Sequence, residues 1–190
     1  MKIEIIEAFK IFVAKINLKQ DLKKIINYSN DIKNKQEGRK YSNYGGFQSD
    51  NLNRKDSALI PLIKEIEFQS NVIAKEIFKV GFNLQLDNIW VNINGFKDFN
   101  IVHRHNLSKL SGVFYVKTPK KSGNLVFVSD TEIENYITNE NFLEYNPYNS
   151  STYGIVPEEN VLYLFPSWLK HYVEPNLSKE KRISISFNLM

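Results

Sequence analysis

The spacing of hydrophobic residues changes near residue 81 and divides the chain into two parts. Before Gly81, apolar residues recur mostly three or four positions apart, which is typical of amphipathic helices. After Gly81 they alternate with polar residues, which is typical of half-buried strands. Residues 3–16 are an exception, because they mix alternation with apolar pairs and are rich in Ile, Phe and Val. They predict one or two strands.

A first helix is predicted over residues 21–34. Asp21 belongs to a residue type that caps helix N-termini, because its carboxylate can accept a hydrogen bond from a free backbone N–H of the first turn. The apolar residues that share one face form the expected buried side: Leu22, Ile25, Ile26 and Ile32. Residues 36–56 are polar and contain glycine, so they predict a loop.

A second helix is predicted over residues 58–80, where apolar residues again follow helical spacing. Asp56 and Ser57 precede it and are plausible N-cap residues. Pro61 is compatible with a helix because it falls in the first turn, where its missing N–H would have no partner. Gly81 is the expected stop signal.

Short strands are predicted in the second part, at residues 84–94, 110–119, 123–130, 159–166, 171–175 and 182–190. The polar stretch 131–153 predicts a long loop over one end of the sheet. Short strands combined with N-terminal helices predict a mainly β fold, a sandwich or small barrel buttressed by helices on one face. We expect a single domain over 1–190, with a strand and helices in 1–80 and the β core in 81–190.

Composition excludes several classes of protein. The chain has no cysteine, which rules out disulfides, iron–sulfur clusters, thiolate-bound zinc and cysteine nucleophiles. The apolar residues of the first 19 positions are interrupted by Glu and Lys, unlike those of a signal peptide, and no stretch approaches the roughly 18 apolar residues of a membrane span. These features indicate a soluble, cytoplasmic protein with no membrane partner.

Positive charge is concentrated at the front of the chain. The net charge is +4, and residues 1–60 carry 12 Lys and Arg against 7 Asp and Glu. A basic surface of this kind is compatible with nucleic-acid binding. A solvated, lysine-rich surface is the interpretation that we prefer, and we do not expect nucleic acid as a partner.

Histidine is rare, and its placement suggests a metal site. The chain has three histidines, and two of them form an H-x-H pair at His103 and His105. Residues two apart in a strand point to the same face, so both imidazoles can enter one pocket while Arg104 points away. The third, His171, lies in another β-type segment. Imidazole suits Fe, Zn, Cu and Ni, so these three side chains are candidate metal ligands.

The order of motifs resembles that of 2-oxoglutarate/Fe(II)-dependent oxygenases. These motifs are H-x-H, L-S-G-V-F-Y, S-G-N-L-V-F, L-F-P-S-W-L-x-H and R-I-S-I-S-F-N, preceded by S-N-Y-G-G-F-Q-S-D at residues 42–50. The chain is most similar to a branch common in bacteria and phages, and the similarity runs from that segment to the C-terminus. It implies a double-stranded β-helix, or jelly-roll, core and an Fe(II) enzyme that uses 2-oxoglutarate and O2.

The resemblance also implies roles for individual residues. His103 and His171 match the two histidine ligands of the family, whereas His105 stands where the family usually has a carboxylate. Arg182 and Ser184 match the R-x-S pair that binds the distal carboxylate of 2-oxoglutarate, in agreement with the fit of a guanidinium fork to a carboxylate.

Two further residues are candidates for binding the cosubstrate. Tyr115 and Asn92 are expected on neighbouring strands, from which they can donate hydrogen bonds to 2-oxoglutarate. A core tyrosine and a sheet-edge asparagine explain the same two residues without any ligand. Both explanations stay open at the level of sequence.

Alternative functions also stay open. Because His105 replaces a carboxylate, a cupin-like metal- or ligand-binding module without oxygenase turnover is the main alternative. The substrate, a small molecule or a protein, is not encoded in any recognisable motif. Twofold association into a homodimer is the default expectation for the oligomeric state.

Overall fold

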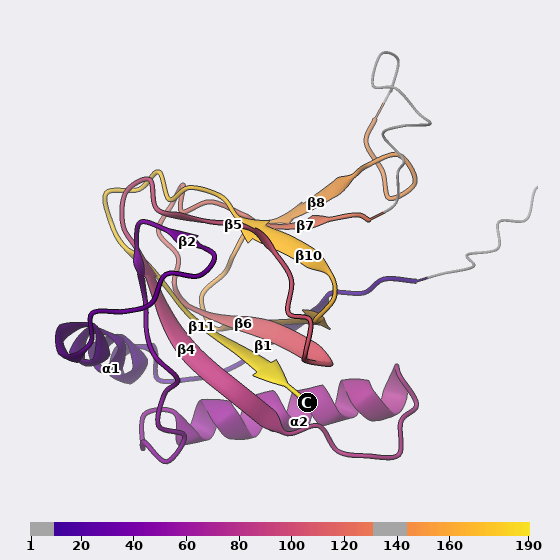
Figure 1. Cartoon of the computed structure of the whole chain (residues 1–190), viewed down its shortest axis with the longest axis horizontal. Helices are drawn as coiled ribbons and strands as arrows, with labels where there is room; N and C mark the ends of the chain where they lie inside the picture. The colour runs from indigo at the N-terminus through magenta and orange to yellow at the C-terminus, as the bar shows by residue number, and fades with distance from the viewer. Residues whose placement is uncertain (1–9, 131–143) are drawn as a thin grey trace, which may run out of the picture.

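Two antiparallel sheets face each other in the computed structural model, which describes residues 10–130 and 144–190. The six-stranded sheet has the order β1 (Ala14–Asn17), β9 (Val161–Pro166), β6 (Leu110–Lys117), β11 (Arg182–Leu189), β4 (Leu86–Asn94) and β3 (Phe47–Gln48). The five-stranded sheet has the order β2 (Asn43–Tyr44), β5 (Phe99–His103), β10 (Lys170–Val173), β7 (Leu125–Val128) and β8 (Thr152–Ile155). Helices α1 (Leu22–Lys35) and α2 (Ile60–Glu76) lie on the outer side of the larger sheet (Figure 1).

Helix α1 begins where the sequence predicts. The side chain of Asp21 accepts a hydrogen bond from the backbone N of Lys24 at 3.0 Å, which satisfies one of the free donors of the first turn. Ile25 is buried, and its apolar neighbours on the same face pack against the core. The helix ends at Lys35, one residue beyond the predicted range.

Helix α2 is shorter than predicted at both ends. Asp56 does not cap it directly: its carboxylate accepts from the backbone N of Ala58 at 2.9 Å, which forms a turn before the helix begins at Ile60. At the other end the backbone N of Val80 donates to the carbonyl of Ala74 at 3.1 Å, and Lys79 has φ 53°. This left-handed residue and the six-to-one hydrogen bond form a Schellman-type stop, so the helix ends before Gly81.

Strand β11 shows how alternation separates the two faces of the larger sheet. Ile183, Ile185 and Phe187 are buried in the core that also contains the inner side of α2. Arg182 and Ser184, which alternate with them, point to the opposite face, toward the space between the sheets. The helices therefore cover one face of this sheet and leave the other free to form a site.

The predicted mainly β fold with helices on one face is confirmed, and the six strands predicted after residue 81 all occur. Four of the described strands lie outside the predicted ranges: β2 and β3 within 36–56, β5 at Phe99–His103, and β8 at the end of 131–153. The N-terminal part also supplies edge strands to both sheets. In the six-stranded sheet β1 pairs with β9 and β3 pairs with β4, and in the five-stranded sheet β2 pairs with β5. Residues 131–143 of the predicted loop lie outside the described part of the chain.

Candidate functional site

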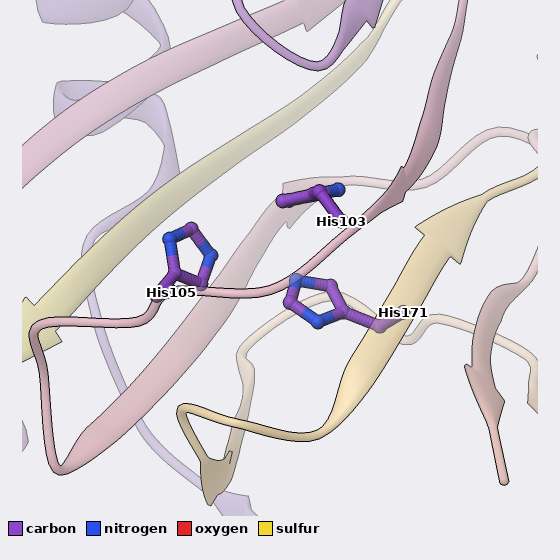
Figure 2. Close-up of side chains that lie close together, drawn as sticks. All are labelled: His103, His105 and His171. Carbon is purple, nitrogen blue, oxygen red and sulfur yellow. The ribbon is translucent and has the colours of Figure 1, made fainter. Parts of the chain in front are cut away.

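The three histidines meet between the sheets. His103 is the last residue of β5, and His171 lies in β10 as its direct register partner. Their ring centroids are 4.3 Å apart, and His105 lies 5.2 Å from His103 and 5.4 Å from His171 by the same measure. Each can offer one nitrogen so that the three lie within 4.8 Å of one another (Figure 2). This spacing suits a single metal ion.

Hydrogen bonds select the ring nitrogen that is free to bind a metal. Nδ1 of His103 lies 2.8 Å from the carbonyl oxygen of Ile101, and Nδ1 of His171 lies 2.9 Å from that of Leu169. A carbonyl can only accept, so each Nδ1 carries the proton and donates. The Nε2 lone pairs are then the available ligand atoms, and the backbone fixes the orientation of both rings.

Burial keeps the three imidazoles neutral. Desolvation lowers the pKa of His171 to about 3, with smaller contributions from the neighbouring histidines. Desolvation, followed by repulsion from His103, lowers the pKa of His105 to about 4. The pKa of His103 is also lowered, mainly by desolvation. Because a metal binds the neutral ring, all three are in the binding form at neutral pH.

His105 reaches the site by a different route from the one predicted. The strand β5 ends at His103, so the alternation of a strand does not orient His105, and that premise was wrong. Instead the backbone N of His105 donates to the carbonyl of Ser167 at 2.9 Å, which ties this segment to the turn before β10. The ring of His105 lies beside Trp90, with centroids 6.0 Å apart.

No carboxylate belongs to this histidine cluster among residues 10–130 and 144–190. The two acids nearest in the sequence have other partners. The side chain of Asp98 accepts from the backbone N of Gly95 at 2.6 Å, and Asp130 forms an ion pair with Lys170 at 2.5 Å. The described ligand set is therefore three neutral imidazoles.

The residues predicted to bind 2-oxoglutarate line the same inner cavity as the histidines. Ser184 of β11 is the register partner of Asn92 on β4 and of Tyr115 on β6, so the three form a row across adjacent strands. Arg182 lies two residues before Ser184 on the same face. All seven predicted site residues are thus brought together around one cavity.

Arg182 is the most unusual of these side chains. It is 1% exposed, yet it has no carboxylate partner among the described residues. Its Nη1 donates to the carbonyl oxygens of Ser122 and Glu174, the latter at 3.1 Å, whereas its buried Nη2 has no hydrogen-bond partner in the described structure. Burial lowers the pKa of the guanidinium from its ordinary value. An unpaired buried cation of this kind is costly unless a ligand completes it.

Several polar residues that line the inner cavity were missed at the level of sequence, among them Ser186 and Asn94. Ser186 accepts a hydrogen bond from the side-chain amide of Asn92 at 2.9 Å, and Asn94 is the register partner of Arg182. The period of two could have found both, because Ser186 follows Ser184 and Asn94 follows Asn92 on the same faces.

A larger, outer cavity of about 700 Å³ adjoins the histidines. His103, His105 and Trp90 line both cavities. The outer wall also includes Arg104, which was expected to point away from the pocket and does stay out of the inner cavity. The segment 36–56 supplies much of the remaining wall, through Arg39, Tyr41, Ser42, Gln48, Ser49 and Asn51. The volume is in the range typical of small-molecule sites.

Comparison with known proteins identifies the family. The family model described as "Putative 2OG-Fe(II) oxygenase" matches residues 88–188, more than half of the chain. The chain belongs to this family of 2-oxoglutarate- and Fe(II)-dependent oxygenases. It is accordingly a dioxygenase-type oxidoreductase whose cofactors are Fe(II), 2-oxoglutarate and O2. No curated protein matches the sequence.

Solved structures share the fold at low identity. A prolyl-4-hydroxylase from Pseudomonas putida is 13% identical, with a TM-score of 0.65, and the match covers 93% of this chain and 91% of that one. A viral collagen prolyl hydroxylase from Paramecium Bursaria Chlorella virus-1, in a 2-oxoglutarate complex, is 12% identical, with a TM-score of 0.59 and coverage of 93% and 95%. HygX from Streptomyces hygroscopicus, with nickel and 2-oxoglutarate bound, is 9% identical, with a TM-score of 0.64 and coverage of 94% and 82%. These likenesses establish the jelly-roll fold.

Within the described residues, the helices are too short or too polar to cross a membrane.

Proposed function

We propose that this oxygenase holds Fe(II) on His103, His105 and His171 and binds 2-oxoglutarate between that metal and Arg182. The observation that carries the proposal is the buried Nη2 of Arg182, which has no hydrogen-bond partner among the described residues and belongs to the cavity that the histidines also line. The distal carboxylate of 2-oxoglutarate would supply the missing acceptor. A charge-assisted bond of this kind is stronger than a neutral one.

Neighbouring side chains would orient the cosubstrate. The carbonyls of Ser122 and Glu174 hold Nη1 of Arg182 and so fix the guanidinium before any ligand arrives. The hydroxyl of Ser184 and the phenol of Tyr115 stand in the same row and can donate to a carboxylate. Burial raises the pKa of Tyr115 to about 12, so this phenol keeps its proton at neutral pH.

The histidines fit the metal by geometry and by chemistry. Their neutral rings and their spacing suit Fe(II) as well as other borderline metals. When bound, Fe(II) and 2-oxoglutarate supply the activation of O2 that hydroxylates a substrate C–H bond, with succinate and CO2 as co-products. The protein contributes ligand geometry, a fixed cosubstrate and a cavity shielded by the walls of the two sheets.

A second candidate is a cupin-like module that binds metal or a small ligand without turnover. The observation that favours it is the ligand set itself, because three imidazoles carry one negative charge less than two imidazoles and a carboxylate. Such a site would bind Fe(II) with a different affinity and redox behaviour.

One experiment separates the two candidates. Under anaerobic conditions, Fe(II) and 2-oxoglutarate should together produce a weak visible charge-transfer band, and admission of air should yield succinate. Neither band nor succinate would appear if the site binds no 2-oxoglutarate. The variant His105→Asp places a carboxylate at the position where the 2-oxoglutarate/Fe(II) oxygenases usually have one. An oxygenase should keep or gain Fe(II)-dependent succinate formation in this variant, whereas a non-catalytic module should remain inactive.

The proposal includes a homodimer. Apolar side chains stay exposed along and after α2, among them Phe68, Val72, Ile77 and Phe82. Exposed apolar patches often mark protein interfaces. Light scattering of the purified chain measures the mass, and a single species of 22.2 kDa at all concentrations would contradict the dimer.

A further inference from the structure

In the described part of the chain, the wall of the outer cavity carries two guanidinium groups, and the one on Arg104 has no ion-pair partner. We infer that Arg104 binds a carboxylate of the substrate, so that this oxygenase acts on a polar molecule or side chain with one negative charge. The inference rests on the proposed function for the position of the metal, but the geometry of Arg104 and the test below do not require a metal.

Arg104 is placed to bind substrate and not cosubstrate. It lies between His103 and His105 in the chain and lines the outer cavity, while it is absent from the inner cavity around Arg182. A substrate anion held by Arg104 would therefore lie beside the metal ligands, with the rest of the molecule in the outer cavity. Arg182 would then bind the distal carboxylate of 2-oxoglutarate in the inner cavity, and Arg104 would bind the carboxylate of the substrate in the outer cavity.

Its charge is available for a ligand. Among residues 10–130 and 144–190, Arg104 forms no hydrogen bond or ion pair with another side chain. Arg39 lines the same cavity, but its Nε is paired with the carboxylate of Asp50 and its Nη1 contacts the hydroxyl of Tyr41. The guanidinium of Arg39 is therefore held by other side chains of the wall. Of the two arginines, Arg104 is the one without a side-chain partner among the described residues.

The other charges of the wall favour a monoanion. Asp87 also lines the cavity, where its carboxylate accepts from the side chain of Asn88 at 2.6 Å. A phosphate dianion would find one free guanidinium and a repelling carboxylate, whereas a carboxylate needs only the guanidinium fork.

Uncharged polar groups make up much of the remaining wall. The amides of Gln48, Asn51, Asn88 and Asn188 line it together with the hydroxyls of Ser42 and Ser49. Such groups offer both donors and acceptors, so they suit a substrate that carries hydroxyl, amide or amine groups beyond its carboxylate. Several of them already have partners within the protein, and a purely apolar substrate would remove water from the others without supplying new hydrogen bonds.

Fluorine NMR of small probes tests the assignment without metal. Trifluoroacetate is the carboxylate probe, trifluoroacetamide is its neutral counterpart, and monofluorophosphate is the phosphate probe. The wild-type chain should broaden the trifluoroacetate line and leave trifluoroacetamide sharp. In Arg104→Gln the dissociation constant for trifluoroacetate should rise about tenfold, because a charge-assisted hydrogen bond is lost. Arg104→Lys should recover part of the binding.

Arg39→Gln is the matched control, because it removes a guanidinium from the same wall that already has a partner. It should change trifluoroacetate binding less than Arg104→Gln does. Equal dissociation constants for trifluoroacetate in Arg104→Gln and the wild type would overturn the inference, because the measured site would then not contain Arg104. Loss of that binding in Arg182→Gln would place the probe at Arg182 in the inner cavity instead. Tighter binding of monofluorophosphate than of trifluoroacetate would also overturn it in favour of a phosphate-bearing substrate.

A parallel cobalt titration distinguishes this inference from the proposed function. Co(II) bound to imidazoles has visible absorption, and Arg104→Gln should retain it because the histidines are unchanged. If the wild type binds no Co(II) but Arg104 still governs trifluoroacetate binding, the metal assignment fails and the anion site stands. If Co(II) binds and Arg104→Gln leaves trifluoroacetate binding unchanged, the anion site fails alone.

Discussion

His103 and His171 are register partners on the adjacent antiparallel strands β5 and β10, with ring centroids 4.3 Å apart. Cross-strand partners place their side chains on the same face of a sheet, so this pairing aims two imidazoles at one point. Each ring is also fixed by a hydrogen bond from Nδ1 to a carbonyl two residues earlier in its own chain segment. The pair forms a rigid half of the proposed metal site, to which a less regular segment adds His105.

Removing either member of this pair should abolish stoichiometric metal binding. We expect His171→Ala to weaken Co(II) binding by about 100-fold or more, since loss of an outer partner alone typically costs about 10–100-fold. The affinity of each variant for Co(II) is measured by visible absorption during a titration. Trp90→Phe is the control, because Trp90 contacts the ring of His105 but offers no ligand. Unchanged affinity in His171→Ala would place the metal elsewhere.

Replacing Arg182 should affect 2-oxoglutarate and not the metal. Arg182→Lys keeps the charge but removes the planar fork, so the dissociation constant for 2-oxoglutarate should rise at least about tenfold. Calorimetric titration of 2-oxoglutarate into the Co(II)-loaded protein measures this. Arg39→Lys, in the outer wall, is the matched control and should retain the wild-type constant. Equal effects of the two substitutions would contradict the assigned role.

Tyr115 should couple stability to alkaline pH. Burial raises its pKa to about 12, above the ordinary value of a tyrosine phenol, so the folded state favours the protonated phenol. This contribution to stability is fully present below pH 10 and is lost as the pH rises toward 12. Urea denaturation at pH 9, 10 and 11 should therefore show a falling free energy of unfolding. Tyr115→Phe should reduce the slope, and an identical slope in both proteins would refute this origin.

The two faces of β11 should respond differently to truncation. Phe187 is fully buried in the core beneath the larger sheet, so Phe187→Ala should lower the free energy of unfolding by about 3–5 kcal/mol. Ser186, next to it, faces the inner cavity and accepts one hydrogen bond from Asn92. Ser186→Ala should cost about 1 kcal/mol. Urea denaturation measures the free energy of unfolding of both variants. Comparable losses of stability would contradict the assignment of Phe187 to the core face and Ser186 to the cavity face.

Local patterns were sufficient for much of the fold. Asp21 and the apolar spacing after it predicted α1, because capping and helical periodicity act within a few residues. The short strands β2, β3, β5 and β8 lay outside the predicted ranges because two to five residues carry too little periodicity. The early end of α2 escaped as well, since a left-handed Lys79 is not a common stop signal.

The sequence by itself determined that Arg182 and Ser184 share a face, because side chains in a strand repeat every two residues. It also identified the histidines of the H-x-H pair as candidate metal ligands. Only the tertiary structure decided that β5 pairs with β10 in the register that joins His103 to His171. It also decided that His105 leaves the strand and is held by the carbonyl of Ser167. Such contacts join distant parts of the chain, and their register depends on how both sheets pack, which no local pattern encodes.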